Sequence, residues 1–268
     1  MYLVDTHCHL NKEYFPEGLE QVFKNALDND VKRLLFASAD LESSREAVAL
    51  ANIRHDAPEV WALVGVHPHE AASAESGLHD ELCDLALAPR VVGIGEIGLD
   101  YFYDNSPRDV QRNVFRLQIE IAKRIKKPIV IHVRDAADRA CGNANEEALE
   151  ILRETGADAV GGVIHCFSGT AEDAREALRL GFYISFAGPV TYTKNILLRQ
   201  IAMDIPLDRI LCETDSPYLA PQGFRGRTNE PCHVRSVYEL LSMLKGVSLD
   251  DFAEAVRKNG ERIFGWGV

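Results

Sequence analysis

The sequence predicts a single (β/α)8 barrel, a TIM barrel, with an additional helix at the C-terminal end. Eight short apolar runs with the composition of buried strands alternate with stretches of helical periodicity. Strict alternation over short connections implies a parallel sheet, and eight repeats favour closure into a barrel. A length of 268 residues suits one such barrel, and no linker or change in composition marks a second domain within residues 1–268.

The predicted strands are the apolar runs, several of which end at a histidine or an acidic residue. In chain order they cover residues 2–4, 32–38, 60–66, 91–96, 128–132, 161–165, 182–186 and 209–215. An open, doubly wound sheet is the alternative for this alternation. It lacks the support of a glycine-rich phosphate loop after the first strand.

The predicted helices carry apolar side chains at intervals of three and four residues. They cover residues 18–29, 43–55, 146–154, 172–180 and 195–203, and a weaker helix ends near Leu87. The longest helix opens at Pro107, a residue type favoured in first turns because it has no N–H to leave unpaired. Two further helices end the chain, and the second is expected to start at Ser248 with Asp251 as its capping-box partner.

Histidines and carboxylates gather where the predicted strands end. His7 and His9 are spaced i, i+2 in one strand, so both imidazoles project from the same face. The C-terminal ends of barrel strands form one rim, which holds the active site in this class of fold. The further residues predicted at this rim are His67, His69, Glu96, His132, His165 and Asp215.

These side chains indicate a metal centre. A lone histidine at a strand end is more often a hydrogen-bonded polar residue, but clustered imidazoles without a metal leave polar groups poorly satisfied. Four imidazoles and two carboxylates are too many ligands for one tetrahedral ion, so we expect two divalent ions. The predicted metal ligands are His7, His9, Glu96, His132, His165 and Asp215.

Glu96 and Asp215 are also the predicted catalytic residues. Glu96 lies between the two groups of histidines along the rim and is the expected bridge between the ions. A pair of ions can activate a water molecule and polarise the bond that it attacks. Asp215 is expected to take the proton of that water, which predicts hydrolysis of an ester, a phosphoester or an amide.

Other rim residues are candidates for substrate binding. Arg134 follows His132 by two residues and leans to the same face, and His67 is a rim histidine outside the ligand set. Arg225 and Arg227 lie in a glycine-containing loop after the last strand, where barrels often hold phosphate. Guanidinium groups match pairs of phosphate oxygens, although a single arginine is as often only a surface charge.

Six segments resemble the TatD family of metal-dependent deoxyribonucleases, and they occur in the family's order. They are DTHCH at 5–9, GVHPH at 65–69, GEIGLDY at 95–101, HCFSG at 165–169, TDSPYLAP at 214–221 and NEP at 229–231. The resemblance spans nearly the whole chain and implies an amidohydrolase-like barrel with a two-metal site. It implies one ion held by His7, His9, Glu96 and Asp215, and a second ion held by Glu96, His132 and His165.

The resemblance favours an exonuclease that cleaves phosphodiester bonds of DNA, with a single strand or a strand end as its partner. The alternatives are a hydrolase of a small amide, lactone or aminoacyl ester, and a metal-binding protein without catalysis. A formal net charge of −12 argues against a broad basic face for nucleic acid, but not against a small site dominated by bound ions. Histidine-rich ligation favours Zn, Mn, Fe or Ni, whereas nuclease activity in the family is associated with Mg.

Segments that would place the chain in or across a membrane are not evident. No apolar run is long enough to span a bilayer, and no leader precedes the first strand. The six cysteines are scattered without a CxxC pair, which predicts reduced thiols. We therefore expect a cytoplasmic protein without membrane contact, while nothing in the sequence indicates its oligomeric state.

Overall fold

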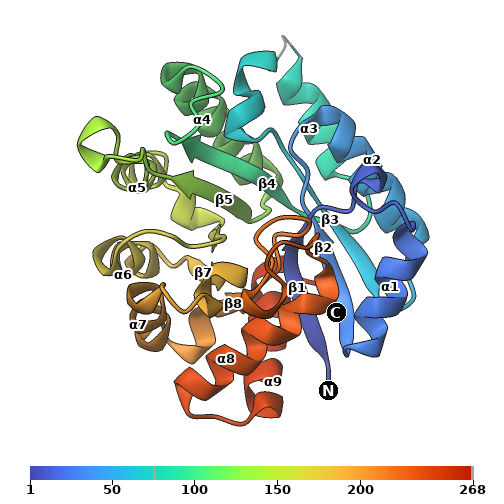
Figure 1. The fold of residues 1–268 in the computed structure, drawn as a ribbon. Helices are drawn as coiled ribbons and strands as arrows, with labels where there is room; N and C mark the ends of the chain where they lie inside the picture. The colour runs from blue at the N-terminus through green and yellow to red at the C-terminus, as the bar shows by residue number, and fades with distance from the viewer. Residues whose placement is uncertain (75–76, 267–268) are drawn as a thin grey trace.

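The computed structural model describes residues 1–74 and 77–266 and shows a nearly closed (β/α)8 barrel (Figure 1). Eight strands follow one another in chain order around one sheet, and neighbours pair in parallel. They are β1 (Leu3–Cys8), β2 (Val31–Phe36), β3 (Glu59–Val64), β4 (Val91–Asp100), β5 (Ile129–Arg134), β6 (Gly162–Ile164), β7 (Tyr183–Phe186) and β8 (Ile210–Cys212). The predicted fold class is confirmed.

The ring of strands closes just beyond β8. Cys8, at the end of β1, forms a parallel bridge with Ser216. On either side of this bridge, the Asp215 N–H donates to the His7 carbonyl over 2.9 Å, and the His9 N–H donates to the Ser216 carbonyl over 2.7 Å. The last seam of the barrel therefore joins two segments that carry three of the predicted metal ligands.

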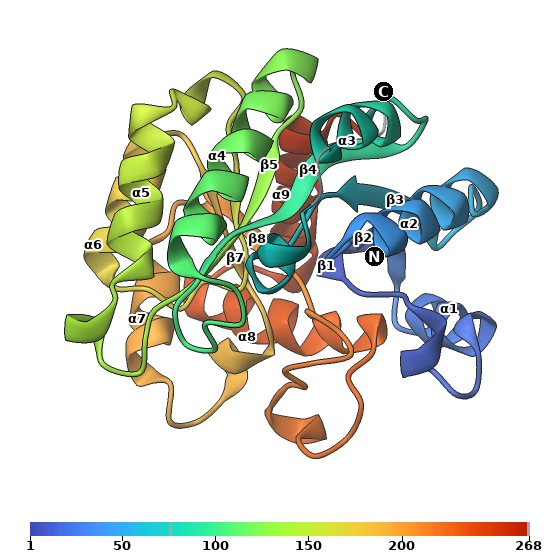
Figure 2. The ribbon, with the colours of Figure 1, turned by 90° about the horizontal axis from the view of Figure 1, so that it is seen from above.

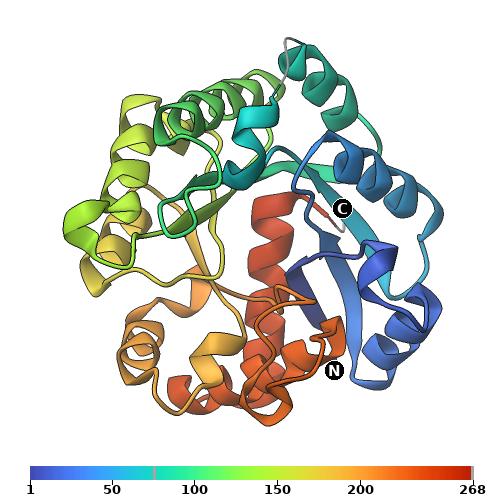
Figure 3. The same cartoon turned by 45° about the horizontal axis from the view of Figure 1, so that its top comes forward.

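Helices form the outer layer of the barrel, as two further views show (Figures 2 and 3). They are α1 (Leu19–Asp28), α2 (Leu41–Ile53), α3 (Leu78–Ala86), α4 (Arg108–Ile125), α5 (Ala144–Glu154), α6 (Ala171–Arg179), α7 (Ile196–Asp204), α8 (Val234–Lys245) and α9 (Leu249–Phe264). The additional C-terminal helix α9 packs against α8, β1 and β8. Ser248 caps α9 as expected, because its hydroxyl accepts from the Asp251 N–H over 3.1 Å. The Asp251 carboxylate accepts from the Ser248 hydroxyl and not from its backbone N–H, so the expected capping box is not formed.

The strands are buried because helices cover their outer face and packed side chains fill the barrel. At the end of the barrel away from the strand C-termini, the guanidinium of Arg33 lies 5.4 Å from the ring of Trp266 and 5.9 Å from that of Trp61. Trp266 follows α9 and is fully buried, so this segment completes the core. No helix of residues 1–74 and 77–266 is long and apolar enough to cross a membrane.

Most strands end a few residues from the predicted position, and the differences in β4 and β8 bear on the candidate site. β4 continues past Glu96 to Asp100, because Gly98 lets it stay paired with β5. At Gly98, where φ is +143°, a Cβ would stand 1.9 Å from the carbonyl oxygen of His132. β8 ends at Cys212, and Asp215, with φ of +55°, lies in the turn that follows. Apolar periodicity shows neither a glycine that extends a strand nor a turn that ends one.

Candidate metal centre

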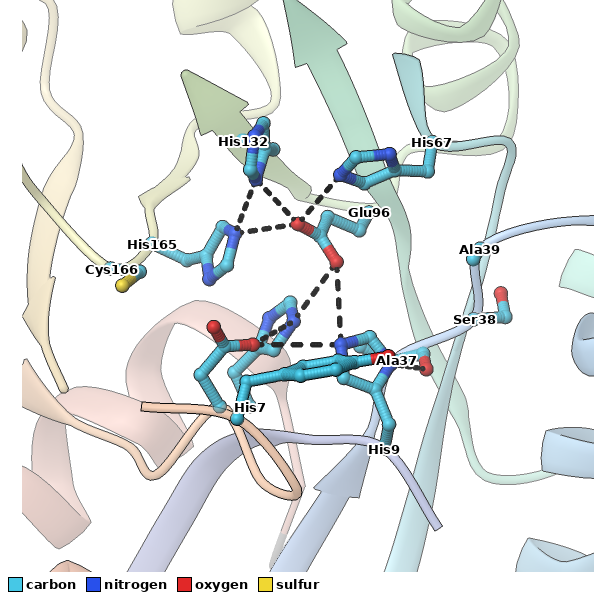
Figure 4. A network of polar contacts seen from close by, with 12 residues as sticks. His7, His9, Ala37, Ser38, Ala39, His67, Glu96, His132, His165 and Cys166 are labelled. Atoms are coloured by element: carbon cyan, nitrogen blue, oxygen red, sulfur yellow. Dashed lines mark hydrogen bonds and ion pairs between the residues drawn. The ribbon is translucent and has the colours of Figure 1, made fainter. Parts of the chain in front are cut away.

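The six predicted ligands converge at the C-terminal rim of the barrel. They come from β1, β4 and β5 and from the residues just after β1, β6 and β8, and they are His7, His9, Glu96, His132, His165 and Asp215. Figure 4 shows the imidazoles around the carboxylate of Glu96. Glu96 is only 3% exposed. The side chains of Asp215 and His132, at 14% and 19%, are the most exposed of the six and mark the open side of the cluster.

The two oxygens of Glu96 face two different groups of imidazoles. Oε2 lies 3.2 Å from His7 Nε2 and 3.6 Å from His9 Nε2. Oε1 lies 2.8 Å from both His132 Nδ1 and His165 Nε2. One carboxylate therefore links two sets of nitrogen donors, as a bridging ligand must.

Asp215 belongs to the first of these two groups. Its Oδ1 lies 3.5 Å from His9 Nε2 and 3.8 Å from His7 Nε2. The ligand atoms of His7, His9 and Asp215 all lie within 4.8 Å of one another, as do those of His67, Glu96 and His132. By distance alone, either set is compact enough to hold an ion.

Partners outside the cluster determine which nitrogen an imidazole offers to its centre. His9 Nδ1 lies 2.9 Å from the carbonyl oxygen of Ala37, which can only accept a hydrogen bond. His165 Nδ1 faces Oε1 of Glu213, a fully buried carboxylate, at 3.2 Å. In the neutral form of each ring the proton therefore sits on Nδ1, and the lone pair of Nε2 points into the cluster.

His132 is held in the opposite tautomer with the same result. Its Nε2 lies 3.1 Å from Oδ2 of Asp100, so the proton of the neutral ring sits on Nε2. Its Nδ1 then turns a lone pair toward Glu96. Lone pairs set against carboxylate oxygens repel unless the rings are protonated or a cation lies between them. The donor set therefore fits divalent ions, and imidazole with carboxylate suits Zn, Mn, Fe or Ni.

The charges of the cluster support one another. Burial would raise the pKa of Glu96, but the surrounding histidines, His165 foremost, outweigh it and hold this pKa well below its usual range. Burial likewise raises the pKa of Asp215, but the hydrogen bond with His9 and the charges of the nearby histidines outweigh burial and lower this pKa. Burial would lower the pKa of His165, yet Glu96 and Glu213 raise it well above its ordinary value. The rim thus keeps two carboxylates ionised.

His67 differs from these histidines because its Nδ1 accepts a hydrogen bond. The His69 N–H donates to it over 3.1 Å, so Nε2 carries the proton in the neutral ring. This Nε2 lies 3.3 Å from Oε1 of Glu96. Burial lowers the pKa of His67 to about 4, which keeps the ring neutral near pH 7. His67 therefore presents an N–H donor, which suits a carboxylate or phosphate oxygen better than a metal ion.

The three predicted arginines lie outside the histidine cluster. The guanidinium of Arg134 lies over the rings of Phe102 and Tyr103, with Cζ 4.0 and 4.8 Å from their centroids. Arg225 and Arg227 are exposed in the loop after β8. The structure thus brings Arg134 to the β4 side of the rim and keeps the other two on the β8 side.

Two carboxylates that sequence reasoning did not select surround the cluster. Glu213 faces His165 and also accepts from the Cys166 N–H over 2.6 Å. Asp100 faces His132. The available signal was weak, because each residue is simply an acid near a predicted ligand in the sequence. Their contacts depend on pairings between different strands, which no local pattern specifies.

The barrel and its rim define a class of protein before any relative is considered. Imidazoles and carboxylates converge on the strand C-termini of a (β/α)8 barrel, and this combination is typical of metal-dependent hydrolases. The family described as TatD related DNase matches residues 4–265. The chain belongs to the TatD family and is a metal-dependent hydrolase of that family.

Individual relatives agree over nearly their whole length. The chain is 39% identical over 262 residues to a Bacillus subtilis protein named "Uncharacterized metal-dependent hydrolase YabD", covering 98% of each chain. It is 32% identical over 267 residues to an Erwinia billingiae protein named "3'-5' ssDNA/RNA exonuclease TatD", again covering 98% of each. Among solved structures, the Escherichia coli TatD homologue YJJV superposes with a TM-score of 0.89 at 26% identity, covering 99% of this chain and 98% of that one.

Proposed function

We propose that the protein is a deoxyribonuclease that hydrolyses phosphodiester bonds at the end of a single DNA strand with two divalent ions bound at the rim. The observation that carries the proposal is the carboxylate of Glu96, whose two oxygens face two separate groups of imidazoles. The similarity to a relative named as an exonuclease of single-stranded DNA and RNA supports the choice of substrate.

In this proposal the ligands divide around Glu96. Its Oε2 and Asp215 would hold one ion with His7 and His9. Its Oε1 would hold the other ion with His132 and His165. Bound divalent ions would activate a water molecule and stabilise negative charge on the phosphoryl oxygens. Glu213 and Asp100 would keep the imidazole lone pairs of His165 and His132 directed at such ions, through the hydrogen bonds described above.

Asp215 is the proposed general base. Its carboxylate stays ionised because its pKa is lowered, so it can accept a proton near pH 7. Its side chain is more exposed than that of Glu96, at 14% against 4%, so it borders the open side from which water and substrate enter. Glu96, deeper in the cluster, has the bridging role instead.

Recognition of phosphate is assigned to neutral and cationic donors around the opening. His67 offers its Nε2–H toward the centre, and Arg134, Arg225 and Arg227 stand on two sides of the rim. A guanidinium can donate two parallel hydrogen bonds to phosphate oxygens. Because the protein carries a formal net charge of −12, such local donors are the means by which a strand end can bind.

The test is hydrolysis of end-labelled, single-stranded DNA by protein loaded in turn with Zn, Mn, Fe, Ni or Mg. We expect nucleotides to be released from one end with at least one of these ions, and chelation to stop the release. Glu96→Ala tests the bridging role, and His67→Gln is its matched control. Glu96→Ala should remove more metal per chain than His67→Gln, because the His67 side chain is proposed to donate a hydrogen bond rather than to bind an ion. Retention of both ions by Glu96→Ala would contradict the bridging role.

A panel of lactones, amides and aminoacyl esters tests the competing activities on the same preparations. Turnover of these compounds, with every metal form inactive on DNA, would overturn the proposed substrate while leaving a hydrolase. Full metal content without turnover of any compound would instead indicate a binding protein.

A further inference from the structure

The exposed aromatic rings of the molecule gather at the rim. Among residues 1–74 and 77–266, the exposed large apolar side chains that are aromatic are Phe102, Tyr103 and Tyr218. Phe102 and Tyr103 lie two and three residues after the end of β4 and are 46% and 54% exposed. Tyr218 follows β8, and its ring lies 5.9 Å from that of His9. Rings left half in water beside a candidate active site are typical of ligand recognition rather than of core packing.

The loop that carries Phe102 and Tyr103 is tied to the candidate metal centre by one carboxylate. Oδ1 of buried Asp100 accepts from the N–H groups of Phe102 and Tyr103, over 2.9 Å each. Its Oδ2 lies 3.1 Å from Nε2 of both His132 and His69. The two rings are thus positioned by the same group that orients a proposed metal ligand.

Arg134 completes a surface that we call the stacking ledge, which consists of Phe102, Tyr103 and Arg134. The rings of Phe102 and Tyr103 meet edge to face, with centroids 4.9 Å apart at 79°. The guanidinium lies over both rings, and this cation–π contact holds the three planar groups together. Bases of single-stranded nucleic acids stack on such aromatic and guanidinium planes.

The net charge of the protein gives a reason for binding by stacking. At a formal charge of −12 the protein repels a polyanionic strand at long range. Phosphate contacts weaken as salt rises, because binding no longer gains as much from released counterions. Stacking of a base on an aromatic plane needs no counterion release and tolerates any base, since every base has a π face. A short-range apolar contact therefore complements the few cations at the rim.

We propose that the stacking ledge binds one nucleobase of the strand whose phosphodiester bond is hydrolysed at the rim. This inference rests on the proposed nuclease function and adds to it a recognition element for the base. The ledge accepts any base, and it separates nucleotides from phosphoesters, lactones and amides that carry no planar group.

The first experiment measures stacking directly. Oligonucleotides with 2-aminopurine at each of the last three positions are bound to metal-loaded Asp215→Asn protein, in which hydrolysis is expected to be slow. We expect the fluorescence to be quenched at one of these positions, and the quenching to be lost in Phe102→Ala and Tyr103→Ala but kept in Tyr103→Phe. Ile53→Ala serves as the control, because Ile53 is 79% exposed at the C-terminal end of α2, away from the rim.

The second experiment combines the variants with abasic substrates in the metal-loaded enzyme. Phe102→Ala should lower kcat/KM on an intact strand by about 5- to 100-fold, the range expected for the loss of one stacked base. On a strand that is abasic at the stacked position, Phe102→Ala should cause little further loss. Metal content per chain is measured in parallel and should not change.

The outcomes separate the two proposals. If no strand is hydrolysed with any metal, the nuclease function fails whatever the fluorescence shows. If strands are hydrolysed but the ledge variants slow intact and abasic strands equally, or no 2-aminopurine is quenched, the stacking inference is overturned and the nuclease function stands.

Discussion

At the scale of single residues, the centre depends on which nitrogen each imidazole directs inward. His9 and His165 keep their proton on Nδ1, which donates to an oxygen acceptor behind each ring, whereas Nδ1 of His67 accepts from a backbone N–H. Histidines that look alike in the sequence therefore divide into lone-pair donors and a proton donor. The division follows from one backbone carbonyl, one buried carboxylate and one backbone N–H.

Asp215→Asn separates general-base catalysis from metal binding. The amide keeps the shape of the carboxylate and can still coordinate weakly, but it cannot accept the proton of a water molecule. General-base catalysis is typically worth about 10²–10⁴-fold, so kcat on single-stranded DNA should fall at least about 100-fold. KM should change much less, because the arginines are untouched. A near-normal kcat at full metal content would contradict the assignment of Asp215 as the general base.

Arg225→Ala is the expected contrast to that variant. The guanidinium of Arg225 is exposed and lies over the ring of Tyr192 rather than against a predicted metal ligand, so metal content and kcat should stay close to those of the parent. Binding of a phosphate-bearing substrate should weaken, and the dependence of KM on salt should become shallower because one cationic contact is lost. An unchanged salt dependence would exclude Arg225 from phosphate recognition.

His67 should make the metal-free protein sensitive to mild acid. Its pKa is about 4 in the folded protein, against about 6.5 for an exposed imidazole. As pH falls from about 6.5 toward 4, the unfolded chain binds a proton on this ring and the folded chain does not, so stability is lost. His67→Gln removes this contribution and should gain about 1–3 kcal/mol relative to the parent over that window. Urea unfolding at pH 7.5 and 4.5 measures the difference in unfolding free energy between the variant and the parent. The same difference at both pH values would contradict the predicted effect of His67.

At the scale of elements, β4 brings the bridge and its surroundings to the rim. Gly95 and Gly98 let this strand run against β5 without side-chain overlap, since a Cβ at Gly95 would stand 2.8 Å from Val130. The strand thereby carries Glu96 into the cluster and, four residues later, Asp100 behind His132. The close pairing of β4 with β5 therefore also places these two carboxylates.

Gly98→Ala should disturb both stability and metal binding. The new Cβ would overlap the His132 carbonyl, and alanine also disfavours a φ of +143°. We expect a loss of about 2–5 kcal/mol in unfolding free energy together with reduced metal content. Gly181→Ala is the control, because φ there is +85° and no atom lies within 4 Å of the added Cβ. Equal losses in the two variants would show that the overlap with β5 does not matter.

Sequence patterns predict which strands carry the ligands of the candidate site, but not the contacts that the strands make with one another. The i, i+2 spacing of His7 and His9 and the acid that ends an apolar run at Glu96 reflect strand periodicity, which is local. The extension of β4 to Asp100 depends on Gly98 fitting against His132, and the contact of Glu213 with His165 joins residues 48 positions apart. Such contacts arise from the register between strands, which periodicity does not encode.

At the scale of the whole molecule, we expect the fold not to depend on the proposed ions. The core is a continuous set of buried apolar residues along the strands and the inner faces of the helices, while the proposed ligands occupy one end only. Chelation should therefore leave the far-ultraviolet circular dichroism spectrum nearly unchanged. The melting temperature should fall, because ions that bind only the folded state stabilise it by mass action. Wholesale loss of the helical signal would show that the metals are structural.

The closure of the barrel at the bridge between Cys8 and Ser216 has a consequence for biosynthesis. His7 is translated long before Asp215, yet both belong to the same proposed ion site. A nascent chain that carries β1 to β7 has every imidazole of the cluster and no completed seam. If the proposed nuclease function holds, hydrolytic activity therefore requires synthesis to continue past Asp215, and fragments that end before β8 should not hydrolyse nucleic acids.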